Sequence, residues 1–183
     1  SLFEVGAEIP STKIGIVSEV LRLQEQRDEH RNALQAAPIF GAQMEYLKML
    51  ATEMTHRGTV ALPEADARSV IAAVARKLAQ SGQIEPVGTP AVLATLTAHH
   101  VLDRVDYPQT AFQLEHQQIQ EYYAAFDVRD RLLNLRDDDR DATGRFAADC
   151  VNDPAWAEPL RIIDETFAGQ IGDGEPDRRN TRG

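Results

Sequence analysis

The stretch FQLEHQQIQEYYAA, residues 112–125, contains two hydrophobic periodicities that meet at one histidine. Phe112 and Leu114 alternate with polar residues, as in a half-buried strand. Beyond them, apolar and aromatic side chains recur at i, i+3, i+4 and i+7, which puts them on one face of a helix: Ile119, Tyr122, Tyr123 and Phe126. The sequence therefore predicts a strand that passes directly into an amphipathic helix, with His116 at the junction.

Helical spacing dominates the rest of the chain, so we expect a mainly α fold. It would be a helical bundle followed by a winged-helix-like module with a small β-hairpin and a C-terminal helix. The apolar periodicity predicts helices near residues 11–30, 39–57, 63–81, 90–102, 116–134 and 153–168. Gly58 and Ser81-Gly82 are placed to end two of these helices, because glycine adopts a positive φ readily. We expect a short extended piece at 83–88 and a hairpin around 105–114.

These elements group into four segments along the chain. We predict a helical domain at 1–82, a winged-helix-like domain at 83–135, a C-terminal helical segment at 136–170 and a disordered tail at 171–183. The tail is predicted to be disordered because it has little apolar surface to bury. The acidic run DDDRD at 137–141 is expected to be a solvated turn.

Composition and charge exclude several classes of protein. The 183 residues are 43% hydrophobic and 26% charged, as in a globular protein, and carry a net charge of −10. This acidic balance argues against nucleic acid or an anionic membrane as the main partner, since both are bound through Lys and Arg. Neither an apolar run of 18 residues nor a charged-then-apolar leader occurs, so we expect a cytoplasmic protein. Cys150, the only cysteine, is expected to be a buried structural thiol.

The sequence contains no motif of an independent catalytic centre. Neither GxxxxGK[ST], which cradles phosphates, nor the zinc motif HExxH occurs. His99 and His100 are adjacent on a predicted helix, so they point about 100° apart and cannot share a metal. A calcium loop starting at Asp139 would place Cys150 where a bidentate glutamate is needed, so a solvated acidic loop is the better interpretation. We therefore expect that this segment is not an enzyme.

His116 has two interpretations from its residue type and position. It is either a polar residue in the first turn of a packed helix or an anion-binding group. At a strand-to-helix junction the imidazole lies near free backbone N–H groups and the positive end of the helix, which suits an anion. There it can donate a hydrogen bond to a phosphate oxygen, more strongly if it is protonated.

The same stretch resembles a segment of a known family. It is similar to the F-x-F-x-H-x-x-x-Q-E-Y-x-A-A segment of NACHT-type NTPases, STAND-class proteins related to the NOD-like receptors. The matching residues are Phe112, Leu114, His116, Gln120-Glu121-Tyr122 and Ala124-Ala125. In that family the segment closes a winged-helix domain behind the ATPase core, and its histidine reaches the β-phosphate of bound ADP. The match departs at Leu114, which replaces an aromatic residue, and at Glu115, which adds an acid beside the expected phosphate.

Weaker similarities extend over about residues 1–170. AEIPSTK at 7–13 resembles the family's G-x-x-P segment, whose proline meets the adenine side of the nucleotide; here that residue is Pro10. GQIEP at 82–86 resembles the step before the winged helix, and residues 153–171 resemble the helix that follows it. The resemblance thus implies two nucleotide-binding residues, His116 and Pro10.

By this resemblance the chain is a regulatory, autoinhibitory module that senses the nucleotide state of a NACHT-like signalling ATPase. Its cofactor would be ADP or ATP with magnesium in the full-length protein. Because the P-loop half is missing, we expect an excerpt of a longer protein that does not bind nucleotide tightly by itself. Its partners would be the ATPase core of the same chain and, on activation, further copies of the protein.

Two other classes of function remain open. The first is a helical scaffold that acts through protein–protein contacts and has no nucleotide role. The second is a winged-helix DNA-binding domain. The acidic balance disfavours DNA binding, and so does the predicted helix at residues 91–101, where two histidines are the only basic side chains.

Overall fold

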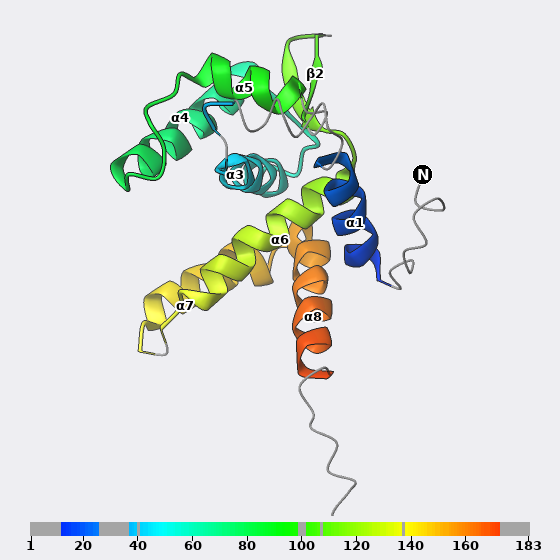
Figure 1. Ribbon diagram of the computed structural model, residues 1–183. Helices are drawn as coiled ribbons and strands as arrows, with labels where there is room; N and C mark the ends of the chain where they lie inside the picture. The colour runs from blue at the N-terminus through cyan, green and yellow to red at the C-terminus, as the bar shows by residue number, and fades with distance from the viewer. Residues whose placement is uncertain are drawn as a thin grey trace, which may run out of the picture.

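The computed structural model describes residues 12–25, 37–39, 41–98, 102–106, 108–136 and 138–172. As predicted, they form a mainly helical protein with a small antiparallel sheet (Figure 1). The elements are α1 (Lys13–Glu25), α3 (Gln43–His56), β1 (Ala61–Pro63), α4 (Glu64–Gln80), α5 (Thr89–Ala98), β2 (Leu102–Val105), β3 (Ala111–Leu114), α6 (Gln117–Leu133), α7 (Arg140–Phe146) and α8 (Ala157–Gly172). A π-helical turn, Ala147–Val151, follows α7, and a 3₁₀ turn, Pro154–Trp156, precedes α8. Within these ranges no helix is long and apolar enough to cross a membrane.

The sheet joins two parts of the chain that are far apart in sequence. β3 lies in its middle and pairs antiparallel with β1 on one side and with β2 on the other. Phe112 of β3 is opposite Leu62 of β1, and Leu114 is opposite Leu102 of β2; all four side chains are buried. From α3 to β3 the order is helix, strand, helix, helix, strand, strand, with the first strand bonded to the last. This is the arrangement of a winged helix.

The winged-helix elements begin earlier in the chain than the sequence predicted. The domain boundary predicted between residues 82 and 83 would divide the sheet, because β1 comes before it in the chain while β2 and β3 come after it. One continuous cluster of buried side chains also spans that boundary. α3 and α4, which the pattern assigned to a helical bundle, therefore share one core with the β2–β3 hairpin.

Two helices end where glycines were expected to end them. At the end of α3, Gly58 has φ +61°, its N–H donates to Thr55 O, and the next N–H, that of Thr59, donates to Met54 O. Gly82 has φ +70° and repeats the same two-bond pattern at the end of α4. In both places the left-handed residue lets the following N–H groups satisfy carbonyls that the helix leaves free.

Two predicted helix boundaries are wrong because short strands interrupt the helical pattern. The helix predicted to begin at residue 63 begins at Glu64, after Pro63 has ended β1. Proline is tolerated there because β1 is an edge strand, where a missing N–H breaks no interior ladder. The helix predicted over 90–102 ends at Ala98, and Leu102 already belongs to β2. Residues 83–88, expected to be extended, form no strand in the described structure.

The acidic run was wrongly predicted to be only a turn. Asp139 is the N-cap of α7, and its carboxylate accepts a hydrogen bond from Ala142 N at 2.8 Å. A capping aspartate satisfies one of the free N–H groups of the first turn, so the run starts a helix. The C-terminal boundary also differs, since α8 runs to Gly172, two residues into the segment predicted to be disordered. The remaining tail, 173–183, lies outside the described residues.

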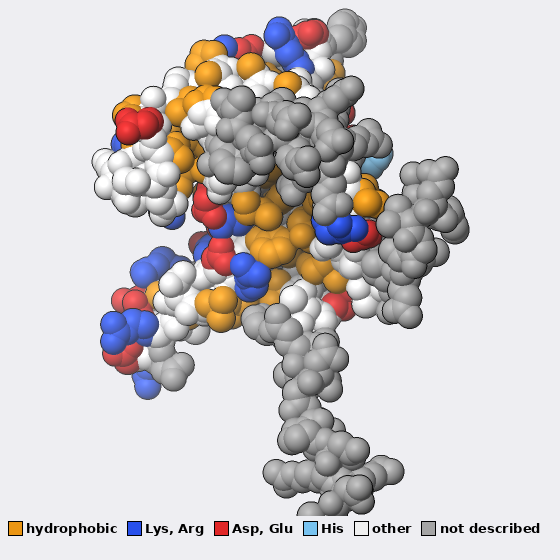
Figure 2. All heavy atoms as spheres, viewed as in Figure 1, with side chains coloured by type: hydrophobic (Ala, Val, Ile, Leu, Met, Phe, Trp, Pro, Cys, Tyr) orange, Lys and Arg blue, Asp and Glu red, His pale blue; other side chains and the backbone are white. Residues whose placement is uncertain are grey.

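α6 is the central helix of the core. It packs against α3 on one side and against α8 and α1 on the other (Figure 1). Its residues Ala124 and Val128 are fully buried, as are Cys150 and Trp156 of the segments that lead into α8. Burial raises the pKa of the Cys150 thiol, as expected for a structural cysteine. A groove opens between α4 and α7, on the left of the view in Figure 2.

Candidate functional site

Most of the stretch from Phe112 to Ala125 builds the core. Phe112 and Leu114 point inward from β3, each about 5% exposed. On α6, Ile119, Tyr122, Tyr123, Ala124 and Ala125 are also buried. The helical stripe predicted from the i, i+3, i+4 spacing is therefore the packed face, although Phe126 at i+7 is only half-buried.

Two polar side chains of the stretch tie α6 to its neighbours. The Gln120 amide is buried and donates to Thr55 Oγ1 at 3.3 Å and to Thr59 O at 3.2 Å, which fixes α6 to the turn after α3. Ser18 Oγ of α1 donates to the Tyr122 hydroxyl at 3.1 Å. The Tyr122 ring packs edge-on against Phe126, with centroids 4.8 Å apart. Gln120 and Tyr122 thus have structural roles that need no ligand.

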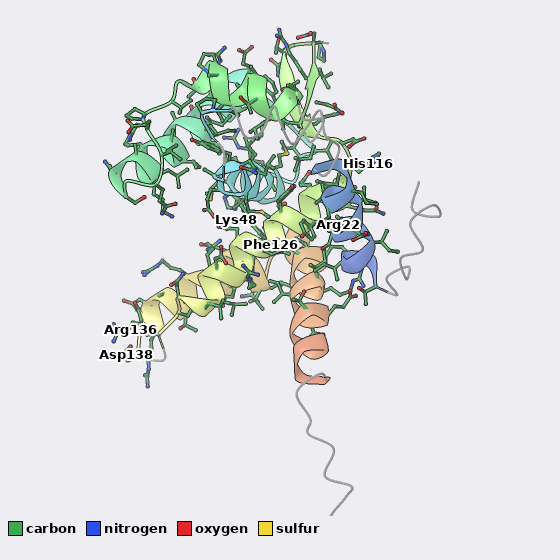
Figure 3. The ribbon with its side chains drawn as sticks, viewed as in Figure 1. Arg22, Lys48, His116, Phe126, Arg136 and Asp138 are labelled. Atoms are coloured by element: carbon green, nitrogen blue, oxygen red, sulfur yellow. The ribbon has the colours of Figure 1, made fainter. Side chains whose placement is uncertain are left out.

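His116 differs from these packed residues. It is the N-cap of α6 with extended backbone angles, φ −141° and ψ 147°, and its side chain is exposed. Its carbonyl accepts the N–H groups of Ile119 and Gln120, but its imidazole makes no capping bond. Among the described residues the imidazole has no hydrogen-bond or ion-pair partner. Figure 3 shows His116 at the end of α6, close to α1.

The first turn of α6 provides donors but no negative charge. No acidic residue lies in that turn, and the N–H groups of Gln117 and Gln118 have no carbonyl of the helix to bind. The helix macrodipole adds partial positive charge at this end. Two acids are close in sequence, Glu115 before His116 and Glu121 one turn on; Glu121 accepts a hydrogen bond from Gln117 at 3.1 Å. The N-terminal end of α6 therefore suits an anion, and among the described residues the acids Glu115 and Glu121 oppose it.

The second predicted binding residue, Pro10, lies outside the described residues, as do His99 and His100. Whether Pro10 lies near His116 is therefore not tested by the described residues. The acidic run serves α7: the Asp139 carboxylate caps it, and the Thr143 hydroxyl donates to Asp139 O at 3.0 Å. Within the described ranges no three His, Cys, Asp or Glu side chains converge as a metal site would require.

A charge cluster around a buried lysine, at the other half of α6, was not predicted. Lys48 of α3 is 7% exposed, and its Nζ lies 2.7 Å from Glu45 Oε1 and 2.6 Å from Asp130 Oδ2 of α6 (Figure 3). Burial lowers the pKa of Lys48, but the hydrogen bonds to Asp130 and Glu45 outweigh it, and the net shift is upward. The pKa of Asp130 is lowered, because the bonds from Lys48 and Arg129 outweigh its desolvation.

Asp127 lies one turn before Asp130 and behaves differently. Burial raises its pKa, and the nearby Arg131 offsets this only in part. The spacing of Glu45 and Lys48 within one helix could have been noticed in the sequence. The contact between Lys48 and Asp130 could not, because the two residues come from distant helices that meet only in the fold.

α5 is the helix that a DNA-binding winged helix would use for recognition, and it carries no charged side chain over Thr89–Ala98. Its exposed residues are small or neutral: Pro90, Ala91, Ala94 and Ala98. Such a surface offers phosphates no cation to bind.

No protein-family model matches this chain, and neither a curated protein nor a solved structure matches it.

Proposed function

We propose that the chain is a regulatory module of a NACHT-like signalling NTPase and that His116 senses its nucleotide state. The observation that carries the proposal is a difference between His116 and the other motif residues within 112–125. Every other side chain of the motif named above is buried or bonded within the protein or, like Glu121, contacts a neighbour. Among these motif residues, His116 alone is exposed and has no partner in the described structure. A packing role accounts for most of the other motif residues but not for the histidine.

The residues present fit the phosphate end of ADP or ATP. An exposed imidazole and two free N–H groups at the positive end of α6 are donors, and phosphate oxygens accept such bonds. The nucleotide would supply the negative charge, and its magnesium ion and most of its contacts would come from the ATPase core in the full-length protein. His116 would hold one phosphate oxygen in the closed state and release it on opening. Only such a differential contact can bias two conformations.

The proposed setting follows from this role. The module would dock on the ATPase core of the same protein in the cytoplasm and would free a surface for self-association when it opens. DNA binding gains no support, because α5 has no charge.

The test is ADP retention by the full-length protein through purification. Losing one charge-assisted hydrogen bond costs about 1.5–3 kcal/mol, on the order of 10–100-fold in the ratio of closed to open protein. His116→Ala should therefore lose bound ADP, and His116→Gln should keep part of it, because an amide still donates. His56→Ala is the matched control, since His56 is also an exposed histidine but lies at the end of α3. Equal retention by all four proteins would refute the sensor role.

A further inference from the structure

α7 and the π-helical turn after it, residues 140–151, form an arm that packs lightly on the rest of the protein. Figure 1 shows α7 beside the C-terminal half of α6, away from the sheet. Within residues 140–151 only Phe146 and Cys150 are buried. Segments with few buried apolar contacts open locally at a small cost in free energy. A few side-chain contacts can therefore decide whether the arm is closed on α6.

One arginine of α6 contacts both parts of the arm. The Arg131 guanidinium lies 5.6 Å from the centre of the Phe146 ring in α7. Its Nη2 also lies 3.5 Å from Asp149 Oδ2 in the π-helical turn. A cation over an aromatic ring and an ion pair both attract, so Arg131 favours the closed arm.

Asp127 lies one turn before Arg131 on α6 and competes for the same guanidinium. Side chains at i and i+4 are neighbours on a helix surface, and Arg131 is the positive charge that acts most strongly on the Asp127 carboxyl. Asp127 and Asp149 line the same groove, on either side of this arginine. Two carboxylates thus share one guanidinium, and its charge is fully available to Asp149 only when Asp127 is neutral.

The other groups near Asp127 do not replace Arg131 as its cation. The charge of Lys48 is already shared between Glu45 and Asp130, as described above. The titratable and polar groups that surround the carboxyl are Lys48 and Thr52 of α3, Asp130 and Arg131 of α6, and Asp149 and Cys150 of the arm. Lys77 of α4 and Arg145 of α7 line the same groove. Burial of the carboxyl outweighs the cations, so the pKa of Asp127 stays raised.

We propose that the arm is a pH-dependent latch, which Arg131 holds closed on α6 and which ionisation of Asp127 loosens. Ionised Asp127 competes with Asp149 for the guanidinium, and opening the arm lets water reach its buried charge. Because the pKa of Asp127 is raised in the closed protein, closure is favoured at acidic pH. It is lost as the pH rises through that pKa, which lies above the ordinary value of about 3.9. The proposal does not depend on nucleotide sensing, since Arg131 lies about 20 Å along α6 from His116.

Cys150 reports the arm directly, because it is the only cysteine of the chain and is fully buried in the π-helical turn. A dithiodipyridine reagent, which reacts with thiols at acidic and neutral pH, labels Cys150 when the arm opens. The measured quantity is protection, the labelling rate of the urea-unfolded chain divided by that of the folded chain at the same pH. We expect protection to fall several-fold between about pH 4.5 and 7.5, a range that starts above the ordinary pKa of aspartate. Protection that stays constant or rises would overturn the proposal, as would labelling no faster than global unfolding allows.

Two variants test the two residues of the latch. Asp127→Asn is neutral at every pH, so its protection at neutral pH should rise to the acidic value and lose its pH dependence. Arg131→Gln should lower protection at acidic pH about 3- to 10-fold, because both of its contacts to the arm are lost. Unchanged pH dependence in Asp127→Asn would refute the role of that carboxyl even if Arg131→Gln disturbed the fold.

The loop before α7 offers matched controls. Arg136 and Asp138 form an ion pair at the same 3.5 Å, but both side chains are exposed to water and the pair ties nothing to α6. Arg136→Gln should leave protection unchanged, and Asp138→Asn should leave its pH dependence unchanged. Equal effects of these changes and of those at Arg131 and Asp127 would mean that Cys150 responds only to overall charge, which contradicts a latch.

Discussion

The polar side chains at the two ends of α6 differ in whether they have partners within the protein. At its N-terminus, His116 is exposed and has no partner in the described structure, although Leu114 before it and Ile119 after it are buried. About 20 Å along the same helix, Asp130 is drawn into a cluster with Lys48, and the protein satisfies both charges internally. A group that the fold leaves free is available to something outside the fold. We therefore expect Asp130 to contribute to the stability of the fold and the imidazole of His116 not to.

The largest effect should come from breaking the core face between these two ends. Ile119 is 4% exposed, so Ile119→Ala should lower the free energy of unfolding by about 2–5 kcal/mol. Phe126→Ala should cost less, because Phe126 is only half-buried and stacks partly under Arg129 at 4.6 Å. Leu132→Ala, on the exposed side of the same helix, is the control. Urea denaturation measures all three, and two unchanged midpoints for Ile119 and Phe126 would mean that another face is packed.

A smaller effect is expected from the charge cluster at the other end. Lys48→Met keeps the buried stem and removes the charge, and should cost about 1–2 kcal/mol at pH 7. Losing a hydrogen bond to a fully buried charged group can cost more than this. The cost is expected to be smaller here because Asp130 is about a third exposed, so that water partly screens its charge. Asp130→Asn should cost a similar amount, and the double variant should cost less than the sum of the two.

The pH dependence of this difference follows from the shifted pKa values. The folded pKa of Asp130 is lowered, so its contribution is present above its ordinary value of about 3.9 and is lost as the pH falls through the folded pKa. The folded pKa of Lys48 is raised, so its contribution is present below about 10.4 and is lost as the pH rises through the folded pKa. The difference between the unmodified chain and Lys48→Met should therefore be largest between about pH 5 and 9. A difference that persists unchanged at pH 2.5 would contradict the assigned pairing.

Asp127 should show the opposite sign. Its folded pKa is raised by burial, so its contribution is present below about pH 3.9 and is lost as the pH rises through the folded pKa. Ionised Asp127 therefore opposes folding at neutral pH, in the range where Asp130 supports it.

The sequence predicted local features better than long-range ones. The α6 stripe and the glycine stops at Gly58 and Gly82 depend on neighbours within one or two turns, and the structure has them as predicted. β1 was missed because its three residues carry no periodicity and become a strand only by pairing with β3. The cap at Asp139 was missed because an acidic run is equally typical of a solvated turn. The groove was missed because its walls come from α3, α4, α6 and α7, which only the fold brings together.

The same limit applies to His116. Its place at the strand-to-helix junction could be predicted from two periodicities that meet there, and the structure has it as the N-cap of α6. The exposure of the imidazole could not, because it depends on how the rest of the fold packs against that end of the helix.

The central claim, that His116 is left free in order to hold the phosphate of a nucleotide, is tested most directly by comparing ADP with AMP. Titration calorimetry on the full-length protein would measure both affinities for the unmodified protein and for His116→Ala. If the imidazole contacts the β-phosphate, the change should weaken ADP on the order of 10–100-fold and leave AMP, which lacks that phosphate, unchanged. Unaltered ADP affinity, or an equal loss for both nucleotides, would contradict the account.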